Sequence, residues 1–354
     1  MSKWYRVLVM GASYGSLLGV KLLAAGHVVR LACLPAEAAL FNEQGARVRM
    51  PIKGRDDLYE IDSRALPGRL SASTPAEVDP QGYDLVVLAM QEPQYRSPGV
   101  RELLAGVIRA KRPCMSIMNM PPLPYLARIP GISLEPLRAC YTDPTVWDGL
   151  DPALMTLCSP DPQAFRPPEE KTNVLQVRLP TNFKAARFES DAHTAMLRDI
   201  AAGIEAARFG FERLELPVKL KVHDSIFVPL AKWSMLLAGN YRCVGTDAMV
   251  SIRDAVHGDL AATRAVYETV AELCRALGAA DADLVPFDKY AEAARSLGSP
   301  SSAARALAAG ATNIERVDRL VQTLLVQRGM QSDAIDAIVA RVDGWLATNR
   351  RQAA

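Results

Sequence analysis

The chain has 354 residues, more than one compact core usually holds, so its length predicts two domains that each bury an apolar interior. Its 41 lysines and arginines nearly balance 39 aspartates and glutamates without a basic run, and no segment offers the roughly twenty uncharged apolar residues of a membrane span, so we expect neither a nucleic-acid nor a membrane partner. The N-terminus has no secretory pattern and the six cysteines are dispersed, which predicts a cytoplasmic protein with buried reduced thiols and no metal site.

The first elements in chain order form a strand, a tight turn, a helix and a second strand. Tyr5–Met10 is an apolar run of strand length, and the glycine-bounded turn Gly11–Gly15 follows it. Ser16–Ala25 has apolar residues at helical spacing and ends at Gly26, after which His27–Cys33 supplies the next strand. Parallel strands joined in this way require a right-handed helical crossover, so we predict a βαβ unit of Rossmann type.

Further alternation of strands and helices predicts a mostly parallel sheet with helices on both faces. Asp84–Met90 and Pro113–Asn119 are strongly apolar strands, with a helical pattern over Val100–Ala110 between them. The segment from 143 to 187 is irregular and rich in Pro and Asp, with short strands predicted at Leu154–Cys158 and Asn173–Leu179.

The remainder of the chain is helical by pattern, with breaks at Gly, Pro and Asn. We therefore predict an α/β Rossmann-type domain with a mostly parallel sheet over residues 1–188, followed by an all-helical domain over residues 189–354. The helices expected in the second domain are Ser190–Phe209, Val222–Asn240, Ser251–Leu277, Phe287–Leu297, Ser302–Gln327 and Ser332–Thr348.

The turn after the first strand is the candidate site for a dinucleotide phosphate. Glycines let a phosphate approach the backbone, and the N–H groups and dipole at the start of the following helix stabilise its charge. The usual fingerprint is G-x-G-x-x-G, whereas this chain reads G-A-S-Y-G, which is one residue shorter. The candidate cofactor-binding residues are Gly11, Ala12, Ser13, Tyr14, Gly15 and Ser16.

Two alternatives for this turn stay open at the level of sequence. The same letters spell G-x-S-x-G, the elbow that presents a nucleophilic serine in α/β-hydrolases, although an elbow on the first strand would be abnormal for that fold. A tight connection that binds nothing is the other alternative. The second strand ends in Cys33-Leu34-Pro35, without the acidic residue or arginine that would normally distinguish NAD from NADP.

Five segments in chain order carry a family resemblance. They are GASYGSLLGVKLLAAGHVVRLACLP, YDLVVLAMQEPQ, MSIMNMPP, HDSIFVPLAKWSMLLAGN and SSAARALAAGATNIERVDRLV. In this order, and with roughly this spacing from about residue 5 to residue 321, they resemble the ketopantoate reductases (2-dehydropantoate 2-reductases). The resemblance implies a nicotinamide cofactor, NADP with NAD possible, a small-molecule carbonyl substrate, and a chain that works as a monomer or homodimer.

The resemblance also implies roles for individual residues. The catalytic lysine of the family falls on Lys232, and two active-site polar residues fall on Asn119 and Asn240. An ammonium beside the substrate would donate a proton and offset the negative charge that grows on the ketone oxygen during hydride transfer. Ser301 and Asn313 fall on positions that bind the substrate.

The catalytic residues have ordinary interpretations as well. A lone helical lysine is usually solvated, but Lys232 lies in an apolar stretch where a charge needs a cleft or a partner. Asn119 would equally suit a turn before two prolines, and Ser301 would suit a helix N-cap. Leu236 and Asn240 follow Lys232 at steps of four, so we expect the three residues to share one face of the predicted helix.

The chain departs from the family where the cofactor and substrate would bind. Gln91 stands where the family usually has a lysine near the cofactor, and Asn119 is a further cofactor contact. Leu34 stands where an arginine commonly meets the NADP phosphate. Leu236 replaces an asparagine, and Asn313 falls near the position of a glutamate, two residues before Glu315.

These observations predict an NAD(P)H-dependent reductase of ketopantoate reductase type that acts on a small 2-oxo acid or a related carbonyl compound. One alternative is an opine or amino-acid dehydrogenase, which relies on a histidine and carboxylate pair, for which His257 with Asp254 and Asp259 is the local hint. Another is a homologue that has lost catalysis and serves as a nucleotide-binding or regulatory module.

Overall fold

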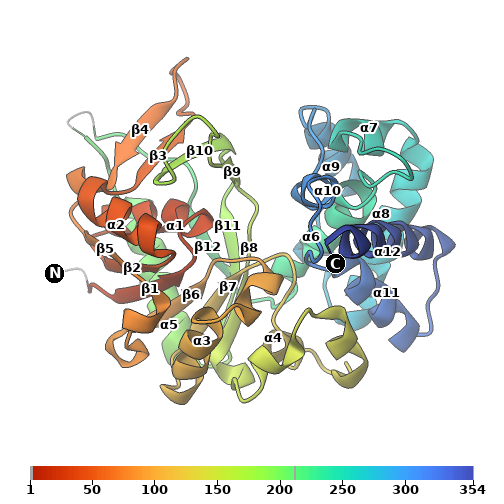
Figure 1. Ribbon diagram of the computed structural model, residues 1–354, viewed down its shortest axis with the longest axis horizontal. Coiled ribbons are helices and arrows are strands. Elements are labelled where there is room, and N and C mark those ends of the chain that lie inside the picture. The colour runs from red at the N-terminus through yellow and green to blue at the C-terminus, as the bar shows by residue number, and fades with distance from the viewer. Residues whose placement is uncertain (1–2, 211–212, 354) are drawn as a thin grey trace. The chain divides into compact units, whose positions relative to one another are not determined.

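The structure, a computed structural model, describes residues 3–210 and 213–353 (Figure 1). These residues divide by their contacts into two compact units. The first unit comprises Met1–Met90, Gln94–Tyr125 and Thr145–Ile226. The second unit comprises Gln91–Pro93, Leu126–Pro144 and Phe227–Ala354.

The last elements of the first unit lie beyond the boundary predicted near residue 188. Helix α5 (Asp191–Ala206) contacts helix α1 (Tyr14–Ala24) and strand β12 (Leu220–His223). Strand β12 pairs in parallel with β11 (Phe183–Ala186). The contacts therefore attach about forty residues of the predicted helical domain to the Rossmann-type sheet.

Within the described residues, the first unit holds an eight-stranded sheet in the order β12-β11-β8-β7-β6-β1-β2-β5. The bounds not yet given are β1 (Arg6–Met10), β2 (Val28–Ala32), β5 (Arg69–Ser73), β6 (Leu85–Leu88), β7 (Cys114–Ile117) and β8 (Met155–Ser159). Neighbouring strands are parallel except β8 and β11. The chain order reverses between β1 and β6, and such a switch point is where open α/β sheets bind ligands.

The predicted βαβ unit and the parallel sheet are confirmed. Strands β1, β6 and β7 are buried almost throughout, which explains their continuous apolar runs. The remaining α-helices described in this unit are α2 (Pro35–Gln44), α3 (Val100–Arg109) and α4 (Leu123–Leu126). The last residue of α4, Leu126, groups by its contacts with the second unit. Helix α2 is absent from the sequence prediction.

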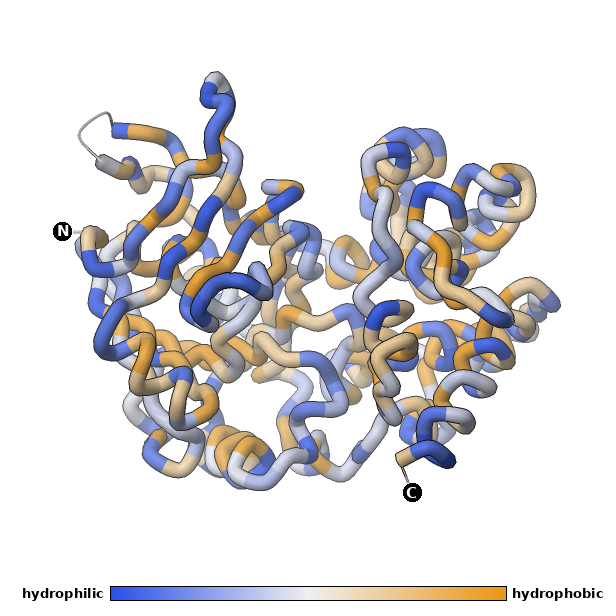
Figure 2. The backbone as a smooth tube through the Cα atoms, turned by 45° about the horizontal axis from the view of Figure 1, so that its top comes forward, coloured by the Kyte–Doolittle hydropathy of each residue, from blue (hydrophilic) through white to orange (hydrophobic). Residues whose placement is uncertain are grey.

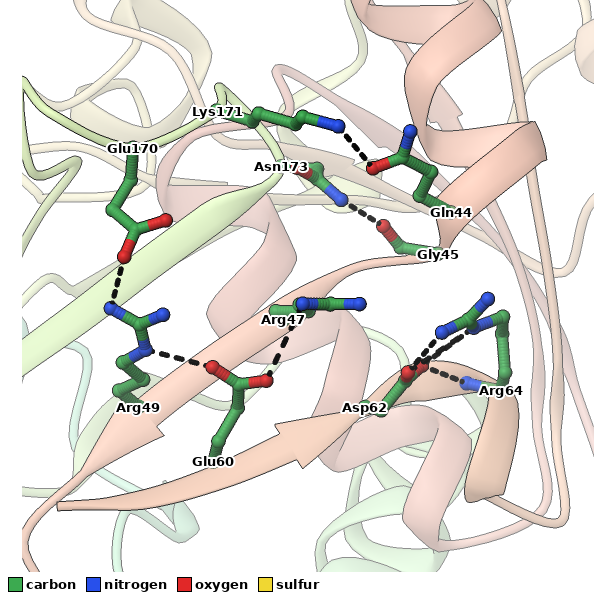
Figure 3. Close-up of polar contacts among 10 residues, drawn as sticks. All are labelled: Gln44, Gly45, Arg47, Arg49, Glu60, Asp62, Arg64, Glu170, Lys171 and Asn173. Carbon is green, nitrogen blue, oxygen red and sulfur yellow. Dashed lines mark hydrogen bonds and ion pairs between the residues drawn. The ribbon is translucent and has the colours of Figure 1, made fainter.

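A second, four-stranded sheet of the described residues has the order β4-β3-β10-β9. Its strands are β3 (Arg47–Met50), β4 (Tyr59–Asp62), β9 (Gln163–Phe165) and β10 (Val174–Leu179). The tip between β3 and β4 is mostly hydrophilic (Figure 2). Arg49 bridges Glu60 at 2.7 Å and Glu170 at 2.6 Å (Figure 3). Because the charged side chains of Arg49, Glu60 and Glu170 form ion pairs with one another, we interpret the part of the second sheet that carries them as solvated protein surface.

The second unit is helical in its described residues, as predicted. Its α-helices are α6 (Lys232–Met235), α7 (Ile252–His257), α8 (Leu260–Leu277), α9 (Phe287–Ala294), α10 (Ser302–Ala308), α11 (Val317–Gln327) and α12 (Asp333–Ala353). None of the described helices is long and apolar enough to cross a membrane. All six cysteines are buried, and no group of three or more metal-ligating side chains occurs in the part of the chain that the structure describes.

Three predicted helices are wrong in their extent. Val222–Asn240 begins as strand β12, because the alternation of Leu220 and Val222 pairs with β11, and helical structure starts only at Val228–Ala231. Ser251–Leu277 breaks after α7, where Asp259 caps α8 by accepting the N–H of Ala262 at 2.9 Å. Ser302–Gln327 breaks between α10 and α11.

Candidate functional site

The turn after β1 can only be built with glycine at its first position. Gly11 has φ of +105°, and its N–H donates to the carbonyl of Ala32 at 3.0 Å. A Cβ at Gly11 would lie 2.8 Å from the carbonyl oxygen of Ala89 and 2.5 Å from Cγ of Met90. The turn therefore packs directly on the end of β6, at the switch point of the sheet.

Gly15 lets helix α1 approach the sheet closely. A Cβ there would lie 2.5 Å from Cγ1 of Val9 on β1. In the dinucleotide fingerprint, this close contact of helix and strand is the task of the third glycine. Gly11 and Gly15 thus fill the first and third roles of the motif, although the turn is one residue short.

The N-terminus of α1 is open to an anion. No side chain caps this 11-residue helix at Ser13, and its first turn holds no acidic residue. Ser16 bonds inward, with its hydroxyl donating to the carbonyl of Ser13 at 2.8 Å. A helix start without a cap keeps N–H groups and a positive dipole end for a ligand. The residues present therefore fit a phosphate group.

Tyr14 has a structural role that the sequence does not predict. Its hydroxyl donates to the carbonyl of Pro162, and its ring packs edge-on against Phe183 with centroids 5.9 Å apart. Burial, with a smaller contribution from Asp161, raises the pKa of the Tyr14 hydroxyl well above its ordinary value. Because the side chain of Tyr14 makes these contacts, its backbone is the part of this residue that can bind a phosphate. Ala12 is buried.

The carboxyl end of β2 carries a charged pair that sequence reasoning missed. Glu37, in the first turn of α2, forms an ion pair with Arg166, which directly follows β9. Burial raises the pKa of Cys33 to about 12, with Glu37 adding to the rise and Arg166 opposing it, so both charges lie close to this thiol. Leu34 is exposed over 69% of its surface. In a Rossmann fold, the end of β2 meets the adenosine ribose.

Asn119 lies two residues after β7 and is half-buried. Because β1, β6 and β7 are parallel, Asn119 lies at the same carboxyl edge of the sheet as the turn at Gly11. The structure thus brings these two predicted elements to one edge. Gln91 lies three residues after β6 and is exposed, and by its contacts it groups with the second unit.

Lys232 lies in a helical segment that is not a regular α-helix. Helix α6 has four residues and is continued by a π turn over Leu236–Asn240, in which the N–H of Tyr241 bonds to the carbonyl of Leu236 at 2.9 Å. Lys232 and Asn240 are half-buried, whereas Leu236 is only 3% exposed. The N–H of Leu236 bonds to the carbonyl of Lys232 as in an α-helix, so these two residues keep the predicted spacing, whereas the step from Leu236 to Asn240 runs through the wider π turn and departs from the α-helical repeat.

Ser301 occupies the N-cap of α10. Its hydroxyl accepts the N–H of Ala304 at 3.1 Å and donates to the carbonyl of Asn240 at 2.7 Å. These bonds bring two predicted residues, Ser301 and Asn240, together, and they assign the serine hydroxyl to the fold. Its proposed contact with a substrate carboxylate stays a prediction.

The predicted substrate residue Asn313 has polar neighbours of its own. Its amide donates to the Thr312 hydroxyl at 3.1 Å, and its oxygen accepts from Arg350 at 3.4 Å. Two residues on, the carboxylate of Glu315 is buried and accepts the backbone N–H of Glu92 at 3.3 Å.

Glu92 is a second residue that sequence reasoning missed. It is 2% exposed, and its carboxylate accepts from both the N–H and the hydroxyl of Thr142, at 3.0 and 2.9 Å. These bonds fix the chain directly after Gln91. Glu92 and Thr142 are 50 residues apart in the sequence, so no local sequence pattern predicts their hydrogen bonds.

The histidine and carboxylate pair of the alternative dehydrogenase does not form at His257 among the described residues. A ring nitrogen of His257 bonds to the carbonyl of Ala291 at 2.9 Å. Asp254 lies 3.2 Å from Arg253, and Asp259 caps α8.

No protein-family model and no curated protein matches this sequence. Solved structures do match over nearly the whole chain. A 2-dehydropantoate 2-reductase from Methylococcus capsulatus superposes with a TM-score of 0.68 at 13% identity and covers 97% of each chain. A ketopantoate reductase family protein from Ralstonia eutropha has a TM-score of 0.62 at 17% identity, with 98% of this chain and 99% of that chain covered.

The chain has the ketopantoate reductase fold. A D-mandelate dehydrogenase, in a ternary structure with NADH and anilino(oxo)acetate, shares this fold with a TM-score of 0.63 at 13% identity, covering 98% of this chain and 99% of its own. The ketopantoate reductase fold therefore accommodates proteins with different named substrates. At these identities the likeness extends to the fold alone.

Proposed function

We propose that this protein is a nicotinamide-dependent reductase and a divergent member of the ketopantoate reductase family. In this proposal it transfers hydride to the ketone of a small 2-oxo acid or a related carbonyl compound, with Lys232 as the proton donor. The first unit binds the cofactor, NADP or NAD, and the second unit contributes the lysine. The active form is a monomer or a homodimer.

The cofactor part of the proposal rests on the turn at Gly11 to Gly15. The turn lies at the switch point of a mostly parallel sheet, and it leads into an uncapped helix without acidic residues in its first turn. Both features favour a dinucleotide phosphate. In the ribose region, the Glu37 and Arg166 pair offers one group for ribose hydroxyls and one for a phosphate.

The catalytic part rests on the placement of Lys232. It is half-buried beside Ala231 and Trp233, which are 5% and 1% exposed, so little water surrounds the base of its side chain. The chemistry that a nicotinamide would supply when bound here is hydride transfer to the carbonyl carbon. The ammonium of Lys232 would then donate a proton to the developing alkoxide and stabilise its charge, while Asn119 and Asn240 orient the substrate by hydrogen bonds.

The test is a screen of 2-oxo acids with NADPH and with NADH, followed by the substitution Lys232→Met. We expect the variant to lose at least about 100-fold in kcat with cofactor affinity unchanged, because proton donation and charge stabilisation each contribute about this much or more. Lys289→Met is the matched control, since Lys289 is an exposed lysine of α9 in the same unit. Equal turnover of Lys232→Met and wild type would refute the mechanism.

Calorimetric titration separates the reductase from a nucleotide-binding module. A reductase binds a nicotinamide cofactor and turns over, whereas a regulatory module binds the cofactor without turnover on any member of the panel. Absence of binding to both NADPH and NADH would contradict the cofactor site itself.

A further inference from the structure

We propose that Tyr290 and Gly239 act together as positioning residues for Lys232, by holding the π turn that follows it. This inference rests on the proposed function of Lys232. It is carried by the contacts between α9 and the π turn, all of which lie in the second unit.

The hydroxyl of Tyr290 bonds to the residue that joins α6 to the π turn. It donates to the carbonyl of Met235 at 3.2 Å. Met235 is the last residue of α6 and lies three positions after Lys232, so the two residues lie on the same side of one helical turn, and both are half-buried. A bond that fixes Met235 therefore fixes the four-residue helix on which Lys232 lies.

Gly239 creates the space that Tyr290 occupies. A Cβ at this position would lie 1.9 Å from the Tyr290 hydroxyl oxygen and 3.2 Å from its Cζ, with Cγ2 of Ile252 next at 3.4 Å. No side chain larger than hydrogen fits there while the hydroxyl stays in place. The glycine and the tyrosine hydroxyl are thus complementary, and the requirement is for space because Gly239 does not have a positive φ.

Tyr290 is itself held firmly. It is 7% exposed, and its ring stacks on Tyr267 with centroids 5.4 Å apart and an interplanar angle of 21°. Burial raises the pKa of Tyr290, so its hydroxyl remains a donor at physiological pH.

Further bonds hold the other end of the π turn. Ser301 donates to the carbonyl of Asn240 at 2.7 Å. The Tyr241 hydroxyl donates to the carbonyl of Glu315 and accepts the N–H of Val317 at 3.1 Å. π turns are rare and are frequent at functional sites. Here two hydroxyl groups from other segments, those of Tyr290 and Ser301, bond to the two ends of the turn, and Tyr241 ties its end to a third segment, within a few residues of the proposed proton donor.

The first test compares Tyr290→Phe with Tyr267→Phe. Both tyrosines belong to the same buried pair, but the hydroxyl of Tyr267 donates to the carbonyl of Val285 at 2.6 Å and not to the π turn. We expect Tyr290→Phe to lower kcat about ten-fold with KM for the cofactor unchanged, since displacements of about 1 Å cost up to about 100-fold. Tyr267→Phe should keep kcat. Equal losses in the two variants would overturn the proposal.

The second test is a double-mutant cycle. Gly239→Ala should lower kcat more than Tyr290→Phe does, because the added Cβ collides with the hydroxyl. Adding Tyr290→Phe to Gly239→Ala removes the colliding hydroxyl and leaves only the closer than usual contacts with Cζ and Ile252, so the double variant should regain most of the activity of Tyr290→Phe alone. A double variant no better than Gly239→Ala would contradict the complementarity. If Gly239→Ala does not fold, rescue of folding by Tyr290→Phe gives the same answer.

A readout without turnover separates this inference from the proposed function. Reductive ¹³C-methylation of the lysines gives one NMR signal per lysine, and Lys232→Met assigns the signal of Lys232. Tyr290→Phe should shift this signal and its titration, whereas Tyr267→Phe should leave both unchanged. An unmoved signal overturns the positioning role even if the enzyme is active. A moved signal supports it even if the reductase assignment fails.

Discussion

Lys21 is a buried lysine on α1, the helix that follows the proposed phosphate turn. Its side chain is almost inaccessible, with 2% of the residue exposed, and its ammonium donates to the carbonyl of Pro217 at 2.5 Å. The pKa of Lys21 is lowered from 10.5 to about 7, chiefly by burial and next by the nearby charge of Lys219, with Glu205 and Glu215 opposing the change. Protonated Lys21 is therefore destabilising in the folded state.

The sign of the pH dependence follows from this direction. Between pH 7 and 10.5 the unfolded chain binds more protons at Lys21 than the folded chain, so the free energy of unfolding rises with pH over this range. The lowering of the pKa from 10.5 to about 7 corresponds to about 5 kcal/mol, of which about 4 kcal/mol destabilises the folded state at pH 7 and about 1 kcal/mol at pH 9.5.

Lys21→Met removes this titration while keeping an unbranched apolar side chain. We expect the variant to gain stability relative to wild type, and to do so by about 3 kcal/mol more at pH 7 than at pH 9.5. Urea unfolding at intervals of half a pH unit measures the difference. The control is Lys221→Met, which removes an exposed lysine paired with Glu205 at 2.7 Å. If Lys21→Met followed the wild-type pH profile, the reasoning would be refuted.

Two further predictions concern the proposed cofactor site. Gly15→Val should weaken nicotinamide binding at least about ten-fold and destabilise the first unit, because the added Cβ collides with Val9 on β1. Calorimetry measures the binding, and thermal unfolding measures the stability. Unchanged binding in a folded variant would contradict the role of the turn. Glu37→Gln should raise the ratio of kcat/KM for NADPH over NADH, because it frees Arg166 for a phosphate, while Arg166→Gln should lower it. Ratios that do not move in opposite directions would exclude the pair from the ribose site.

The parts of the fold that the sequence predicts well are those encoded by local patterns. Strand β1, the glycine turn and α1 follow each other within twenty residues, and an apolar run, two glycines and a second apolar segment of helix length mark them locally. Of the second sheet the sequence predicts only the strand at Asn173–Leu179, because β9 has three residues and β3 alternates arginines with buried residues. Such short, charged segments are stabilised by pairing partners elsewhere in the chain.

The site is less predictable, because its contacts span long distances in sequence. Arg166 and Glu37 are 129 residues apart in the sequence. The local sequence at the end of β2, Cys33-Leu34-Pro35, has no charged residue and therefore does not predict this ion pair. The π turn has an apolar pattern that also suits an α-helix, and its geometry depends on Tyr290, 55 residues after Met235. The ordered family segments located Lys232, but they could not predict the irregular helix that carries it.

The central claim is that this chain reduces a carbonyl compound with a nicotinamide and uses Lys232 as the proton donor. Its most direct test is to follow oxidation of NADPH and of NADH over a panel of 2-oxo acids with wild type and Lys232→Met, after calorimetry has shown equal cofactor binding. The account predicts oxidation by wild type and a loss of at least about 100-fold in the variant. Equal rates in the two proteins, or cofactor binding by neither, would contradict it.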